Sequence, residues 1–187
     1  IPPPEQIRAI NVHIAHDCPV CGDEITRKAG HYPWIIKRNK PFKLQCPVCK
    51  NIFPSNDFQP WNVGGLEGKP ESGPGYIDKG LGWLGPDGRR YYFVPYYIFW
   101  QRWWRDILGG IPRLAEAYLL TDKPIYAHKC AVMLSKIASE YDRFDYANQA
   151  YHEGKKGIPG RISDRIWSTR DNSKIVLAFD AIFPALN

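Results

Sequence analysis

The chain has 187 residues, of which 44% are hydrophobic, 14% aromatic and 24% charged, and its formal net charge is +6. This composition excludes an intrinsically disordered chain, because aromatic side chains are plentiful and the net charge is small for the length. No run of about 18 apolar residues occurs, so the sequence predicts neither a membrane-spanning segment nor a membrane partner.

We expect four segments along the chain. They are an extended lead-in (residues 1–17), a zinc ribbon (18–60), a glycine- and proline-rich loop with a β-hairpin (61–94), and a helical segment (95–187). The expected fold class is mainly α, with paired helical hairpins, a small four-cysteine zinc ribbon and a β-hairpin.

Four of the five cysteines lie in two Cys-Pro-Val-Cys motifs, Cys18 to Cys21 and Cys46 to Cys49, which are separated by 24 residues. Each motif points two thiolates at one point, and two such turns together make a tetrahedral zinc site. A site with four sulfur ligands has no open position for water, so we expect the zinc to be structural. His13 and His16 are alternative ligands because they lie close to Cys18 in the sequence. Cys130 is expected to be a core residue.

Basic residues are concentrated between the two motifs and just outside them. Residues 27–50 contain no Asp or Glu but seven cations, namely Arg27, Lys28, Lys37, Arg38, Lys40, Lys43 and Lys50. Such a stretch attracts polyanions, nucleic acid included. It would equally neutralise the negative charge of four metal-bound thiolates, so both interpretations stay open.

Short strands are expected at residues 34–36 and 42–44. A second hairpin is expected from Trp83 and Leu84, through a turn at Pro86, Asp87 and Gly88, to a returning strand over residues 89–94.

Helices are expected at residues 95–108, 112–120 and 124–141, with a last helical region that ends at Pro184. The first presents Tyr96, Trp100, Trp103 and Ile107 on one face and a narrow polar strip of Gln101, Arg102 and Arg105 on the other. On the third helix the apolar stripe consists of Tyr126, Cys130, Met133 and Ile137, widened by Ala127, Ala131, Leu134, Ala138 and Tyr141. His128, Lys129, Ser135, Lys136, Ser139 and Glu140 are expected to face water. Ile175, Phe179 and Ile182 form the apolar face of the last region.

The second half of the chain resembles the helical domain of heparinase II/III-like polysaccharide lyases. The resemblance lies in residues 91–146, 160–167 and 177–186. It includes the segments Trp103-Trp104, Leu114-Ala115-Glu116-Ala117-Tyr118 and Tyr126-Ala127-His128-Lys129. It implies part of an (α/α) toroid, which in this family precedes a β-sandwich, and it implies an acidic, uronate-containing polysaccharide as the substrate of a β-elimination.

In this family the catalytic Asn or His, Tyr and His follow the helix that resembles residues 177–186. We therefore assign no catalytic residue here and expect the chain to be the N-terminal portion of a lyase-like protein, with the remainder of the lyase or another subunit as a partner. As substrate-binding residues we expect Tyr97 and Trp104, which would stack on sugar rings, and Arg102 and Arg105, which would pair with carboxylates.

Two other functions are alternatives to the lyase: a zinc-ribbon module that binds a polyanion such as nucleic acid, and a helical scaffold for protein partners. Compartment is also left open. The family resemblance implies export to the periplasm or the extracellular space, whereas reduced cysteines suit the cytoplasm.

Overall fold

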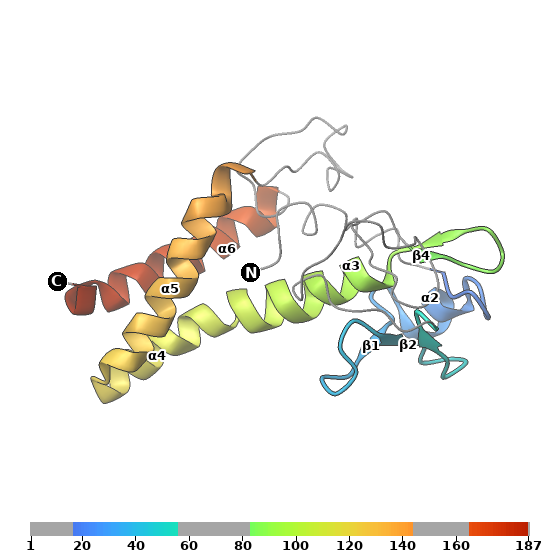
Figure 1. Cartoon of the computed structure of the whole chain (residues 1–187), viewed down its shortest axis with the longest axis horizontal. Helices are drawn as coiled ribbons and strands as arrows, with labels where there is room; N and C mark the ends of the chain where they lie inside the picture. The colour runs from blue at the N-terminus through green and yellow to red at the C-terminus, as the bar shows by residue number, and fades with distance from the viewer. Residues whose placement is uncertain (1–16, 56–82, 144–164, 187) are drawn as a thin grey trace, which may run out of the picture. The chain divides into compact units, whose positions relative to one another are not determined.

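Helices dominate the described part of the molecule, and small antiparallel sheets accompany them (Figure 1). The computed structural model describes residues 17–55, 83–143 and 165–186. These residues divide into two units, one of residues 17–55 and 83–99 and the other of residues 100–143 and 165–186. None of the described helices is both long and apolar enough to cross a lipid bilayer. Apart from Asp17, the expected lead-in lies outside the described residues, as does most of the expected glycine-rich loop.

A three-stranded antiparallel sheet lies at the centre of the first unit. Its middle strand β2 (Leu44–Gln45) pairs with β1 (Ile35–Ile36) on one side and with β3 (Ile52–Phe53) on the other. The strand expected at residues 34–36 is present in shortened form, whereas the one expected at 42–44 is shifted and shares only Leu44 with β2. Strand β3 and helix α2 (Glu24–Ala29) are additional elements, because two or six residues are too few to leave a periodic pattern in the sequence.

The expected hairpin is present as β4 (Trp83–Leu84) and β5 (Arg90–Tyr91), which pair antiparallel. Its turn needs Gly88, which has a φ of +75°, a conformation that residues with a side chain rarely adopt. The returning strand is shorter than the expected residues 89–94, because helix α3 (Phe93–Tyr97) already begins at Phe93.

An aromatic core joins the sheet to this hairpin. The ring of Phe53 on β3 stacks on Phe93 at a centroid distance of 5.2 Å and contacts Trp83 of β4 at 6.5 Å. Trp34 meets Phe93 edge-on at 5.2 Å, and Tyr91 stacks on the same ring at 5.5 Å. Aromatic pairs of this kind contribute roughly 0.5–1.5 kcal/mol each beyond the area they bury. Residues on both sides of the boundary expected at residue 60 therefore share one core.

After α3 the chain continues as a π-helix, η2 (Ile98–Leu108), where an α-helix was expected. The backbone N–H of Gly109 donates to the carbonyl of Trp104, five residues back, at 3.1 Å. This wider turn changes which side chains share a face. Gln101, expected on the polar strip, is buried, and its amide donates to Asp106, five residues ahead, at 2.9 Å. Trp103 and Ile107 are buried as expected.

Three α-helices build the second unit. Helix α4 (Gly110–Thr121) packs against both α5 (Pro124–Glu140) and α6 (Arg165–Ile182), and α5 also packs against α6. Short 3-10 helices, η3 (Tyr141–Arg143) and η5 (Phe183–Leu186), follow α5 and α6. The core residues of this unit include Ile111, Ala115, Ala127, Cys130, Leu134, Ile137, Ala178 and Ile182. The expected helices are confirmed, and α4 and α5 form a helical hairpin through Asp122, which has a φ of 53°.

Three positions on these helices differ from expectation. Ala138, expected on the apolar stripe of α5, is exposed. Glu140, expected to face water, is 8% exposed, and its carboxylate pairs with Lys136 one turn earlier. Phe179, expected in the core, is 46% exposed, because α6 instead buries Asp171, Ala178 and Ile182. Ile182 is buried as expected, and Ala178 takes the buried position that was expected for Phe179.

Candidate metal centre

The two Cys-Pro-Val-Cys motifs form tight turns at the sheet. In the first, the backbone groups of Cys18 and Gly22 exchange two hydrogen bonds, of 3.0 and 2.9 Å, and Gly22 has a φ of +57°. In the second, Cys46 donates its N–H to Asn51 at 2.9 Å and accepts from Lys50 at 3.0 Å. The pairing of β2 with β3 closes this second turn, because Cys46 directly follows β2 and Ile52 begins β3.

The four cysteine sulfurs lie within 4.8 Å of one another. Cys18 and Cys49 have their sulfurs 3.6 Å apart, as do Cys21 and Cys46, so each close contact joins one motif to the other. A tetrahedral zinc ion with zinc–sulfur bonds of about 2.3 Å would separate its sulfurs by about 3.8 Å. A disulfide needs about 2.05 Å, and none of these cysteines is disulfide-bonded. The donor set therefore fits a metal ion bound by four thiolates.

The local electrostatics depend on the crowding of the four thiols. Burial, together with the neighbouring sulfurs, raises the pKa of Cys21, and burial also raises the pKa of Cys49. Burial acts in the same direction on Cys46, but the backbone N–H groups of Cys49 and Val48 outweigh it and lower the pKa of that thiol. A bound divalent cation favours the thiolate form of every ligand and so relieves this crowding.

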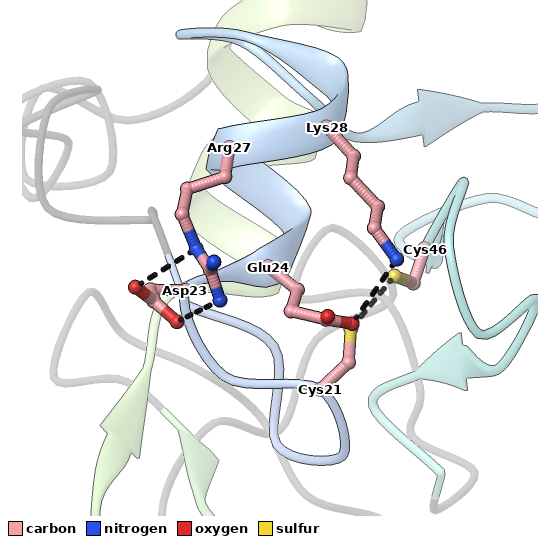
Figure 2. A network of polar contacts seen from close by, with 6 residues as sticks. All are labelled: Cys21, Asp23, Glu24, Arg27, Lys28 and Cys46. Atoms are coloured by element: carbon pink, nitrogen blue, oxygen red, sulfur yellow. Dashed lines mark hydrogen bonds and ion pairs between the residues drawn. The ribbon is translucent and has the colours of Figure 1, made fainter.

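Ion pairs of α2 and the preceding residue Asp23 neutralise part of the basic stretch. Arg27 pairs with Asp23 at 3.3 Å and Lys28 pairs with Glu24 at 3.5 Å (Figure 2). Figure 2 also shows the sulfurs of Cys21 and Cys46 facing one another close to this helix. Exposed pairs of this kind contribute little to stability, but they reduce the net positive charge of the stretch.

The four expected substrate-binding residues have different environments. Tyr97 is only 1% exposed and its ring packs on Phe42 at 5.1 Å, so the expectation that it offers an open stacking surface is wrong. Arg102 pairs with Asp106 at 3.3 Å, and Arg105 donates to Gln101 at 3.4 Å. Trp104 is half-buried.

Two cations lie close to the ring of Trp104, and the sequence does not predict that they are its neighbours. Arg170 and Lys174, one turn apart on α6, lie 5.6 and 5.2 Å from the centroid of its ring. Lys174 also lies 3.9 Å from a carboxylate oxygen of the buried Asp171. Because more than 60 residues separate Trp104 from α6, only the packing of the unit reveals this cluster.

His13 and His16, the alternative metal ligands, lie outside the described residues. Cys130 is fully buried as expected, its thiol lies 3.6 Å from the carbonyl oxygen of Ile111, and burial raises its pKa.

Fold and site together define a mainly helical protein with small antiparallel sheets and a cluster of four cysteines that could hold a metal ion. Comparison with known proteins finds no matching family, curated sequence or solved structure. Function is therefore inferred from the residues and their geometry.

Proposed function

We propose that Cys18, Cys21, Cys46 and Cys49 bind one zinc ion, which holds the first unit together as a zinc ribbon. The close approach of four sulfurs from two identical motifs supports this proposal. Sulfur ligands and tetrahedral spacing favour zinc over the harder cations, which prefer oxygen. Four protein ligands leave no position for a substrate or water, so the metal is structural.

Elemental analysis of the purified chain tests the metal. We expect about one zinc ion per chain, and we expect Cys46→Ser to lose zinc and the folded ribbon. Cys130→Ser is the matched control, because it removes a thiol outside the centre. Full zinc content in a Cys18→Ser/Cys46→Ser double variant would contradict the assignment.

We also propose that the chain is the N-terminal part of a lyase-like protein that acts on an acidic, uronate-containing polysaccharide. In this proposal the α4–α5 hairpin and α6 belong to an (α/α) toroid. The observation that supports it best is the cluster of Trp104, Arg170 and Lys174. Two neighbouring cations can receive a uronate carboxylate, and the half-buried indole beside them offers an apolar surface to a sugar ring.

Binding to a polyuronate such as alginate tests this second proposal, with neutral dextran as the reference. We expect the chain to bind alginate and Arg170→Gln/Lys174→Gln to weaken that binding about tenfold, as the loss of charge-assisted hydrogen bonds predicts. Arg113→Gln/Lys129→Gln removes the same charge from exposed positions on α4 and α5 and should leave affinity unchanged. Equal losses in the two variants, or tighter binding to an oligonucleotide of equal charge, would contradict it.

A further inference from the structure

The connection between β1 and β2 carries three of the lysines of the basic stretch into one place. Lys37, Lys40 and Lys43 line a shallow, open hollow at the surface. Its remaining lining comes from the sheet, and consists of Ile35, Leu44, Gln45 and Ile52. No acidic residue lines this hollow within the part of the chain that the structure describes.

Backbone hydrogen bonds set the spacing of these lysines. The N–H of Lys40 donates to the carbonyl of Lys37 at 3.0 Å, and the N–H of Lys43 donates to that of Lys40 at 3.3 Å. Two consecutive turns therefore bring residues three apart in sequence to the same side of the connection. Lys43 is further fixed by its ammonium group, which donates to the carbonyl of Pro54 at 3.1 Å.

Phe42 anchors the connection to the core. Its backbone has a φ of 62°, which is unfavourable for an aromatic residue, and its side chain is 5% exposed against Tyr97. The contact with the core outweighs the backbone strain and keeps the lysine-bearing turns in one conformation. A cationic hollow that is held in place loses less conformational entropy when it binds an anion.

The lining of the hollow suits an oxyanion. A lysine ammonium is a compact charge with three rotatable donors, so neighbouring lysines can approach different oxygens of one sulfate group. Ile35, which lines the hollow and is 40% exposed, can contact the apolar face of a sugar ring. Among the described residues no aromatic ring lines the hollow, so these residues offer no stacking surface of the kind on which single-stranded nucleic acids depend.

We infer that this hollow binds a sulfate group carried on an acidic polysaccharide. The inference rests on the proposed function for the class of polymer, but it concerns a separate site in the first unit. The hollow would be a second binding site for the polymer, and it would recognise sulfate groups rather than the uronate carboxylate.

The experiment uses the full, zinc-loaded chain with two polymers that separate the sites, dextran sulfate and alginate. Lys37→Gln/Lys40→Gln should weaken binding to dextran sulfate about tenfold and leave alginate binding unchanged, because only the sulfated polymer engages the hollow. Arg113→Gln/Lys129→Gln is the control of equal charge and should affect neither. Zinc content and circular dichroism check that each variant is folded.

Inorganic sulfate and an oligonucleotide complete the design. Sulfate should compete with dextran sulfate more strongly than chloride does at equal ionic strength. If the lysine variant and the Arg113→Gln/Lys129→Gln control bind dextran sulfate equally weakly, net charge alone explains the effect and the inference is overturned. It would also be overturned if the lysine variant lost oligonucleotide binding more than dextran sulfate binding. If the unmodified chain binds dextran sulfate but not alginate, the proposed function is contradicted and this inference stands.

Discussion

At Tyr91 a phenol that is almost completely buried donates its hydroxyl proton to the carboxylate of Asp87, 2.7 Å away. Burial first, and then this hydrogen bond, raise the pKa of Tyr91 to about 12 from its ordinary value of 10.0. The same contact lowers the pKa of Asp87. Asp87 also accepts the N–H of Arg89 at 3.1 Å, so one carboxylate closes the β4–β5 turn.

Because the folded-state pKa of Tyr91 lies above its unfolded value, its contribution to stability is complete below about pH 10 and is lost as pH rises toward 12. We expect Tyr91→Phe to destabilise the chain at pH 8 and to show a smaller further loss between pH 10 and 12 than the unmodified protein. Chemical denaturation across this pH range measures both effects. Parallel pH profiles for the two proteins would contradict the assigned hydrogen bond.

Cys130 provides a second test at the residue scale. Its side chain is fully buried and burial raises its pKa, so it should remain protonated and unreactive in the folded protein. Native, zinc-loaded protein should therefore show Cys130 protected from a thiol reagent, and denaturation should expose it. Peptide mapping identifies the labelled site. Rapid labelling of Cys130 under native conditions would place that face of α5 in solvent.

Among the elements, α6 shows where side-chain burial decides stability. Ile182 is fully buried, whereas Val176 on the same helix is 63% exposed. We expect Ile182→Ala to lower the free energy of unfolding by about 2–5 kcal/mol, the usual range for a large-to-small change in a core. Val176→Ala is the matched control and should change it by less than about 0.5 kcal/mol. Similar losses from the two variants would mean that α6 is packed on a different face.

The sequence predicts elements well where a long periodic pattern or a capping residue is present. Helix α5 begins at Pro124 as its N-terminal proline indicates, and its buried Cys130 lies on the expected stripe. The pattern fails at η2, because an α-helical period of 3.6 residues assigns Gln101 to the wrong face when the turn is wider. The error at Phe179 has a different cause, since hydrophobicity favours burial of the larger Phe179, and only the packing of α6 shows that Ala178 faces the core.

On the scale of the whole chain, the two units have cores of different kinds. The first contains a sheet of two-residue strands with a cluster of aromatic rings, and under our proposal such a small module depends on the zinc ion for its stability. The second is built from three mutually packed helices, and among its described residues no cluster of possible metal ligands occurs.

Zinc removal should therefore affect the units unequally. A strong chelator is expected to abolish the near-ultraviolet signal of the first unit's aromatic core, which includes Trp34 and Trp83. Most of the far-ultraviolet helical signal should persist, because α4, α5 and α6 belong to the second unit. Circular dichroism in the two wavelength ranges, followed by zinc restoration, measures the effect. Simultaneous loss of the near- and far-ultraviolet signals would contradict the prediction that only the first unit depends on zinc.

The candidate sites differ in how far the sequence reveals them. The four cysteines are predictable because two identical motifs carry their own local geometry. The gathering of Arg170 and Lys174 at Trp104 is not, because it depends on how α6 packs within its unit. The burial of Tyr97 is not predictable either, because an aromatic-rich helix does not show in its sequence which rings other segments cover.

The ligands of the metal can be identified most directly by zinc X-ray absorption spectroscopy on the purified chain. Our account predicts four sulfur neighbours at about 2.3 Å and no nitrogen or oxygen in the first coordination sphere. Cys130 should not contribute, so Cys130→Ser should give the same spectrum. A coordination sphere containing nitrogen, as substitution by His13 or His16 would produce, would contradict the four-cysteine centre.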